Sequence, residues 1–238
     1  MSGHLHPITT AIRDIYAIFT KMGFDVALGP ELETEFYNFD ALNVPKDHPA
    51  RDMQDTFWIK HESDENMMNE GRSTRPVLRT HTSPVQIRYM ESHKPPYRII
   101  VPGKCYRNEA TDATHEAQFY QVEGLVIDKN ASLAELKGTL DTFFKSYFGP
   151  DVETRFRPSF FPFVEPGVEV DIRWKDKWLE VMGAGLVHPN VLKAAGLDPN
   201  EWKGFAFGGG IERLLMLKYG IDDIRQFYSG DLRFVHQF

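Results

Sequence analysis

The sequence contains a single cysteine, Cys105, among its 238 residues. One cysteine excludes an internal disulfide and any zinc site built from several cysteines, a pattern typical of proteins from reducing compartments. No run of about 18 apolar residues is present that could span a bilayer, and the amino terminus lacks the hydrophobic stretch of a signal peptide. We therefore expect a soluble, cytoplasmic protein with no membrane contact.

Basic residues are in a minority, with 27 Lys and Arg against 34 Asp and Glu and a net charge of -7. A protein that grips a long stretch of phosphate backbone needs clustered basic side chains, so this chain alone is expected to bind nucleic acid poorly. Residues 79–107 are an exception, with six basic side chains against the one acid Glu91. This segment is either a nucleotide-facing patch or a solvated basic face that acids elsewhere in the fold compensate.

Apolar residues at helical spacing predict helices over 7–22 and 132–148, and a shorter helix from Pro84 to about Met90. The polar segment 60–76 is expected to be a loop, and 204–219 to run from a strand through glycines into a helix. Strands are predicted at 98–106, 119–127, 153–157, 168–174 and 178–182, with a tight turn at Lys175 and Asp176 between the last two. This order favours one α+β domain with an antiparallel sheet flanked by helices over a doubly wound parallel sheet.

The first segment that carries chemistry follows the strand at 98–106. It contains Arg107 and Glu109, then a polar loop with His115, then Phe119 on the returning strand. Arg offers a fork of donors to phosphate oxygens, a carboxylate can accept from an exocyclic amine, and an aromatic ring can stack on a base. Taken alone, Arg-x-Glu is more often a surface ion pair at the end of a strand.

The second segment places Gly208, Gly209 and Gly210 before a helix whose first turns hold Arg213. Neither the Gly-x-Gly-x-x-Gly spacing of dinucleotide-binding folds nor a Walker lysine is present, so the familiar nucleotide loops do not explain these glycines. Close packing of a helix on a strand is the alternative explanation.

In this order and context, the two segments resemble motifs 2 and 3 of the class II aminoacyl-tRNA synthetases, and the likeness implies their catalytic fold. It narrows to the alpha subunit of the bacterial phenylalanyl enzyme and extends over essentially the whole chain. The stretches that carry it are residues 3–7, 29–31, 36–43, 48–52, 79–86, 160–166, 178–181, 187–192 and 231–234. The resemblance implies a ligase that activates L-phenylalanine with ATP and transfers it to tRNA(Phe).

In such an activation the carboxylate of the amino acid attacks the α-phosphorus, so the protein supplies positioning and charge stabilisation rather than a nucleophile. By similarity, Arg107 and Arg213 are the catalytic residues and hold the α- and γ-phosphates. Glu109 is expected to bind the adenine amine, Phe119 to stack on the adenine and His115 to reach the phosphates.

Magnesium is the implied cofactor, because Mg²⁺ prefers a few carboxylate oxygens together with substrate phosphates. By family position its expected ligand is Glu165, with Glu180 as a weaker candidate.

The resemblance also implies a phenylalanine site. Its ring is expected to lie against Phe161 and Phe163, with Ala206 at the far end, although Phe-Pro-Phe in isolation more often belongs to a core. The polar end of the amino acid is expected to be surrounded by His81, Ser83, Gln86, Gln121 and Glu123, with Glu123 as the partner of the ammonium group. An apolar pocket rejects an added hydroxyl only weakly, so limited discrimination against tyrosine is expected.

The family's alpha subunit normally begins with a helical coiled coil that contacts tRNA, whereas this sequence begins at the catalytic core. We therefore expect a single domain over 1–238 without that arm, dependent for transfer on a beta subunit, or a homodimer formed through motif 1. In that motif, Ile15, Phe19, Leu28 and Pro30 are candidates for either core or interface. Two alternatives stay open: a class II paralogue that activates another substrate, and a non-catalytic assembly or regulatory module derived from a synthetase.

Overall fold

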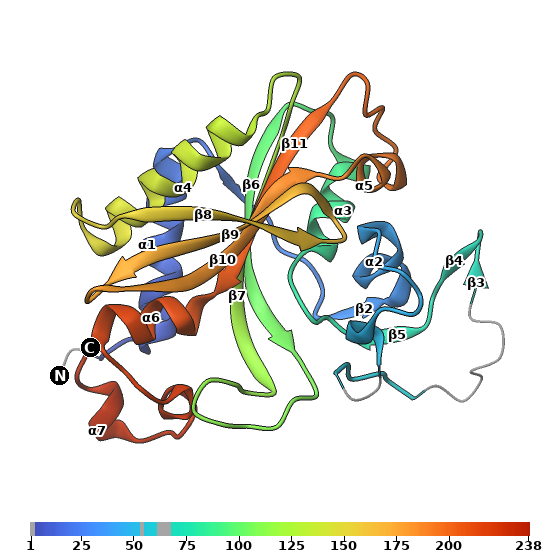
Figure 1. Ribbon diagram of the computed structural model, residues 1–238. Helices are drawn as coiled ribbons and strands as arrows, with labels where there is room; N and C mark the ends of the chain where they lie inside the picture. The colour runs from blue at the N-terminus through green and yellow to red at the C-terminus, as the bar shows by residue number, and fades with distance from the viewer. Residues whose placement is uncertain (1–2, 53–54, 61–67) are drawn as a thin grey trace.

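The protein is described here by a computed structural model that places residues 3–52, 55–60 and 68–238, and in these ranges a seven-stranded sheet forms its centre (Figure 1). Neighbouring strands are antiparallel except β1, which runs parallel to β6. In spatial order the strands are β1 (Asp25–Val26), β6 (Tyr97–Tyr106), β7 (Gln118–Asp128), β11 (Lys203–Gly210), β10 (Lys177–Val187), β9 (Val164–Trp174) and β8 (Thr154–Phe161). The predicted α+β class, with a sheet flanked by helices, is confirmed; the sheet is antiparallel apart from the two-residue edge strand β1.

Three helices cover one face of the sheet: α1 (Pro7–Lys21), α4 (Leu133–Phe148) and α6 (Ile211–Tyr219). Figure 1 shows them to the left of its centre. The predicted stripes meet at the fully buried Phe19, whose ring centroid lies 4.8 Å from that of Phe143 and 5.4 Å from that of Phe207 on β11. Ser132 caps α4, accepting from the backbone N–H of Glu135 at 3.2 Å.

The opposite face is covered by α2 (Glu35–Asn38), α3 (Pro84–Ser92) and α5 (Pro189–Ala194), seen to the right in Figure 1. Since strand side chains alternate faces, Ile100 packs under the first group of helices and Ile99 under the second. The remaining short elements are η1 (Asp40–Leu42), η2 (Pro49–Arg51), η3 (Ile224–Phe227), α7 (Leu232–Val235), β2 (Leu32–Thr34) and β5 (Pro76–Leu78). None of the helices in the described ranges is long and apolar enough to cross a membrane.

The prediction of a loop over 60–76 is wrong for its second half. Strands β3 (Met68–Asn69) and β4 (Arg72–Ser73) form a hairpin there, and β5 begins at Pro76; residues 61–67 lie outside the described part of the chain. Glu70 and Gly71, with φ of 50° and 77°, make the turn. So short a polar ladder has no alternating apolar pattern by which the sequence could reveal it.

The strands β8, β9 and β10 are longer than predicted, and their added ends form part of the candidate site. The expected turn at Lys175 and Asp176 is confirmed, with φ of 45° and 63°. Beyond the predicted ends, glycines interrupt the alternation because side chains would not fit: a Cβ on Gly185 would lie 2.7 Å from that of Val164. The pleat therefore continues through residues that give no strand signal.

Of the motif 1 candidates, Ile15 and Phe19 are fully buried in the core, whereas Leu28 is 74% exposed and Pro30 is exposed as well. The basic segment 79–107 does not form one patch. Arg79 is buried and donates to the backbone oxygens of Gly29, Pro30 and Lys104, while other basic side chains pair with separate acids. Of its six basic residues, Arg107 alone lines the cavities of the candidate site within the described ranges.

Candidate active site

Two arginines more than a hundred residues apart line one cavity of about 380 Å³, here called the polar cavity. Arg107 follows β6, and Arg213 lies in the first turn of α6. The Arg107 guanidinium carbon lies 5.0 Å from the centroid of the Phe119 ring, and Arg213 Nε donates to the backbone oxygen of Glu180 at 3.4 Å. The cavity is lined by Arg107, Glu109, Thr114, His115, Glu116, Phe119, Gly210, Glu212, Arg213, Met216 and Ile224. All five residues predicted to bind ATP therefore converge on it.

A compact turn holds His115 at the rim of the polar cavity. Its Nδ1 lies 3.0 Å from Oδ1 of Asp112, and this carboxylate also accepts from the backbone N–H groups of Thr114 and His115. These donors favour the ionised form and hold the pKa of Asp112 well below its usual range. The turn orients the imidazole, and Asp112 was not among the residues predicted from the sequence.

A second cavity, of about 250 Å³, is here called the ring cavity. Arg107 also lines it, so the two cavities meet at this side chain. The rings of Phe161 and Phe163 lie with centroids 6.0 Å apart and planes at 22°. All eight residues predicted for phenylalanine line this cavity: His81, Ser83, Gln86, Gln121, Glu123, Phe161, Phe163 and Ala206. Gly183 and Val164, which the sequence did not single out, complete the apolar wall together with Ala184.

Glu123 is the buried acid of the ring cavity, only 6% exposed. Its carboxylate accepts from the Ser83 hydroxyl at 2.5 Å, from the Gln86 amide at 2.8 Å and from the Thr82 backbone N–H at 3.0 Å. Burial nevertheless raises the pKa of Glu123 above its usual value. Gly208 allows the close approach of β11, because a Cβ there would lie 2.5 Å from Cγ of Glu123.

His81 stands between the ring cavity and a neighbouring pocket that shares Arg107 and Phe163. Burial, and then the charges of Arg107 and Arg79, lower the pKa of His81 from 6.5 to about 3. Its Nδ1 is buried without a hydrogen-bond partner in the described ranges. The imidazole is therefore uncharged at neutral pH, with a free ring nitrogen to offer.

Glu165 lies apart from both cavities. Its side chain is 75% exposed, and one carboxylate oxygen lies 3.3 Å from Nε2 of His188. Glu180 is nearer the polar cavity through its contact with Arg213, and its pKa is raised by burial and by the neighbouring Glu169. In the described part of the chain, no group of three or more His, Cys, Asp or Glu side chains is arranged to hold a metal. With fewer than three such side chains grouped together, the arrangement suits a cation bound mainly by phosphate and water, as Mg²⁺ usually is, rather than a cage of protein ligands.

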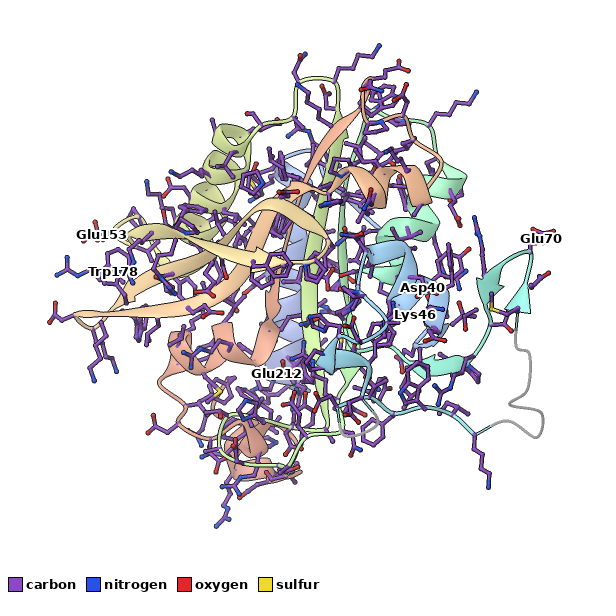
Figure 2. The ribbon with its side chains drawn as sticks, turned by 45° about the vertical axis from the view of Figure 1, so that its right-hand side comes forward. Asp40, Lys46, Glu70, Glu153, Trp178 and Glu212 are labelled. Carbon is purple, nitrogen blue, oxygen red and sulfur yellow. The ribbon has the colours of Figure 1, made fainter. Side chains whose placement is uncertain are left out.

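Glu212 lines the polar cavity and was missed in the sequence. It is 1% exposed, accepts from the Tyr120 backbone N–H at 2.7 Å and from the Tyr228 hydroxyl on the same oxygen, Oε1, and burial raises its pKa to about 7. Figure 2 shows it at the centre of the molecule, between α6 and β7. The available signal was an acid directly before Arg213 at a helix start, which by itself does not distinguish a buried residue from a solvated one.

Known proteins match this chain over nearly its whole length. Residues 1–238 match the family described as tRNA synthetases class II core domain (F). The chain is 54% identical over 250 aligned positions to the phenylalanine–tRNA ligase alpha subunit of Bacillus subtilis, covering 99% of this chain and 69% of that protein. The corresponding subunits of Synechocystis sp. (53% identical) and Dehalococcoides mccartyi (52%) are matched over 99% of this chain and over 67% and 70% of their own lengths.

Proposed function

Because the chain belongs to the class II tRNA synthetase core family, and within it to the phenylalanine–tRNA ligase alpha subunits, we propose that it activates L-phenylalanine with ATP to phenylalanyl-adenylate, releasing pyrophosphate, and then transfers the phenylalanyl group to tRNA(Phe). The observation that carries the proposal is the pair of adjoining cavities. One is polar and bordered by two arginines, the other is apolar with a buried acid at its polar end, and Arg107 stands between them.

In the first step, a carboxylate oxygen of phenylalanine attacks the α-phosphorus of ATP, and the bond to the bridging oxygen of pyrophosphate breaks. Arg107 lies where it can neutralise charge on the attacking carboxylate and the α-phosphate, and Arg213 where it can hold the outer phosphates. Phe119 stacks on the adenine, Glu109 accepts from its amine, and His115 contacts the phosphates. No side-chain nucleophile is needed, because the substrate supplies it.

Selection of phenylalanine follows from the ring cavity. Phe161 and Phe163 present aromatic surface to the substrate ring, and Ala206 limits its length. Glu123 is the partner of the ammonium group, held in place by Ser83 and Gln86. A neutral His81 contributes a hydrogen-bonding nitrogen without the repulsion that an imidazolium would exert on that ammonium group.

Magnesium enters with ATP as part of the substrate complex, where it neutralises phosphate charge. Of the two carboxylates considered, Glu180 adjoins the polar cavity through Arg213, while Glu165 stands outside it beside His188. Neither belongs to a group of three or more His, Cys, Asp or Glu side chains that could hold a metal in the described ranges. We therefore place most of the cation's ligands on phosphate and water, with at most one carboxylate from this chain.

Transfer to tRNA(Phe) is proposed to need a second subunit. The net charge of -7 does not favour unaided binding of a polyanion. Leu28 at 74% and Leu32 at 53% exposure, with Val26 on the edge strand β1, form an uncovered apolar border in the motif 1 region. This border is proposed as the contact with a beta subunit or with a second copy, and the cytoplasmic location stays a prediction.

The test is ATP–pyrophosphate exchange by the purified chain, with phenylalanine, tyrosine or no amino acid present. We expect exchange that depends on phenylalanine, slower exchange with tyrosine, and none when Arg213 is replaced by Ala. Exchange driven by a different amino acid would identify a paralogue with another substrate. Absence of exchange together with absence of ATP binding would support a non-catalytic module.

A further inference from the structure

We propose that Glu212 is a positioning residue for ATP, which fixes the strand that carries Phe119 to the helix that carries Arg213. The inference rests on the proposed function, because it assumes that the polar cavity binds ATP. Glu212 lines the polar cavity, but none of the contacts proposed above for the phosphates or the adenine uses it. Three features of the molecule support it: the end of a strand pairing, two hydrogen bonds to one oxygen, and the sequence neighbours of Glu212.

The pairing between β11 and β7 stops just before Phe119, the residue proposed to stack on the adenine. The last matched pair is Gly210 with Gln121, and the chain then turns into α6 at Ile211. Tyr120, which directly precedes Gln121 in β7, therefore has no β11 residue opposite its backbone N–H. An unpaired N–H in a buried region is costly, and the Glu212 carboxylate accepts from it at 2.7 Å. The side chain thus extends the ladder by one hydrogen bond.

The same oxygen, Oε1, also accepts from the hydroxyl of Tyr228. Tyr228 follows η3, whose Ile224 donates its backbone N–H to the oxygen of Ala113 at 2.9 Å, in the loop that carries His115. One carboxylate therefore joins β7, α6 and the segment after η3. β7, α6 and the adjoining η3 border the polar cavity, through Phe119, Arg213 and Ile224.

The hydrogen bond between Glu212 and Tyr120 joins the direct sequence neighbours of two residues that are proposed to contact ATP. Glu212 directly precedes Arg213, and Tyr120 directly follows Phe119. The hydrogen bond between Glu212 and Tyr120 fixes the spacing between the Arg213 guanidinium and the Phe119 ring. These two groups are proposed to hold the two ends of the nucleotide. The second carboxylate oxygen, Oε2, is buried and has no partner in the described ranges, so ionisation of Glu212 is not needed for either hydrogen bond. An amide oxygen could accept both.

The experiment compares three variants in phenylalanine-dependent ATP–pyrophosphate exchange, with KM measured separately for each substrate. Glu212→Ala should raise the KM for ATP about tenfold or more and change the KM for phenylalanine less than about twofold. Glu212→Gln should stay within about threefold of the wild type in both. Tyr228→Phe, which removes one of the two donors, should raise the KM for ATP by about two- to fivefold.

Glu33→Ala is the matched control. Glu33 is a buried carboxylate, 2% exposed, that accepts from Arg88 at 2.7 and 2.9 Å on the other side of the sheet. Its loss should lower stability without a selective change in the KM for ATP. If Glu212→Ala does not fold, Tyr228→Phe and Glu212→Gln still decide the matter.

The inference is overturned if Glu212→Ala raises both KM values equally, if it lowers kcat alone, or if Glu212→Gln is as impaired as Glu212→Ala. Equilibrium binding of a fluorescent ATP analogue, measured without amino acid, separates this result from failure of the proposed function. A wild-type chain that binds the analogue and weakens on Glu212→Ala supports positioning even where no exchange with phenylalanine occurs. A wild-type chain that binds the analogue but loses nothing on Glu212→Ala refutes it.

Discussion

Gly183→Ala should damage recognition of phenylalanine while leaving ATP binding intact. Gly183 lies on β10 in the wall of the ring cavity, opposite the ring of Phe161. A Cβ at this position would lie 2.9 Å from Cζ of Phe161 and 3.3 and 3.4 Å from its two Cε atoms. Carbon atoms in contact prefer separations of about 3.5–4.0 Å, so the ring has to move by roughly half an ångström or more.

The size of the effect follows from where the ring can go. Overpacking of this kind typically costs about 1–3 kcal/mol. The open space next to the ring is the cavity itself, of about 250 Å³, so a displaced Phe161 occupies volume that the substrate ring needs. If the whole cost falls on the bound state, the KM for phenylalanine rises about 5- to 150-fold, since 1.4 kcal/mol corresponds to a factor of ten.

Exchange kinetics at saturating ATP give the KM for phenylalanine, and saturating phenylalanine gives that for ATP. Gly138→Ala is the control, because Gly138 lies in α4, where an added methyl group would have nothing within 4 Å, and alanine favours a helix there by about 0.5–1 kcal/mol. An unchanged KM for phenylalanine in a folded Gly183→Ala protein would show that Phe161 does not border the substrate.

Three further outcomes are expected. Ala206→Gly should raise kcat/KM for para-chlorophenylalanine relative to phenylalanine by about tenfold, because one methyl group less deepens the ring cavity; an unchanged ratio in exchange assays would place the substrate elsewhere. Burial raises the pKa of Glu212 from 4.5 to about 7, so the folded state holds this proton more tightly than the unfolded state. The free energy of unfolding, measured by urea denaturation, should therefore fall by about 2–3 kcal/mol between pH 5 and 8 relative to that of Glu212→Gln. The same change with pH in both proteins would contradict this. The pKa of His81 is lowered to about 3, so its contribution to stability is present above pH 6.5 and declines as the pH falls toward 3; its Cε1–H NMR signal should not titrate between pH 5 and 8, and a midpoint near 6.5 would refute the assignment of a neutral ring.

The elements that the sequence predicted well are those whose apolar residues recur with a clear helical or strand periodicity. The apolar stripes of α1 and α4 identified both helices to within a residue or two, and the strand predicted at 119–127 lies within β7. The site residues came from the family resemblance rather than from hydrophobic periodicity, and all of them except the expected metal ligand Glu165 line the two cavities.

What could not be predicted depends on contacts between distant segments. The extended end of β10 has no alternating signal, because Gly183 and Gly185 are there to admit neighbouring side chains. Arg79 looks like a surface cation in sequence, yet it is buried with backbone carbonyls as acceptors. Glu212 accepts a hydrogen bond from the Tyr120 N–H only because the pairing of β11 with β7 ends at Gln121, one residue short of Tyr120. Such roles follow from where strands end in space, which local sequence does not record.

The position of Arg107 on the border of both cavities has a thermodynamic consequence. A side chain that one substrate orders is already ordered when the other arrives, so the affinities for the two substrates are coupled. Linkage requires the coupling to be reciprocal: whatever factor ATP contributes to the dissociation constant of phenylalanine, phenylalanine contributes to that of ATP. Replacing this one arginine should therefore reduce the synergy by the same factor in both directions, in addition to weakening each substrate alone.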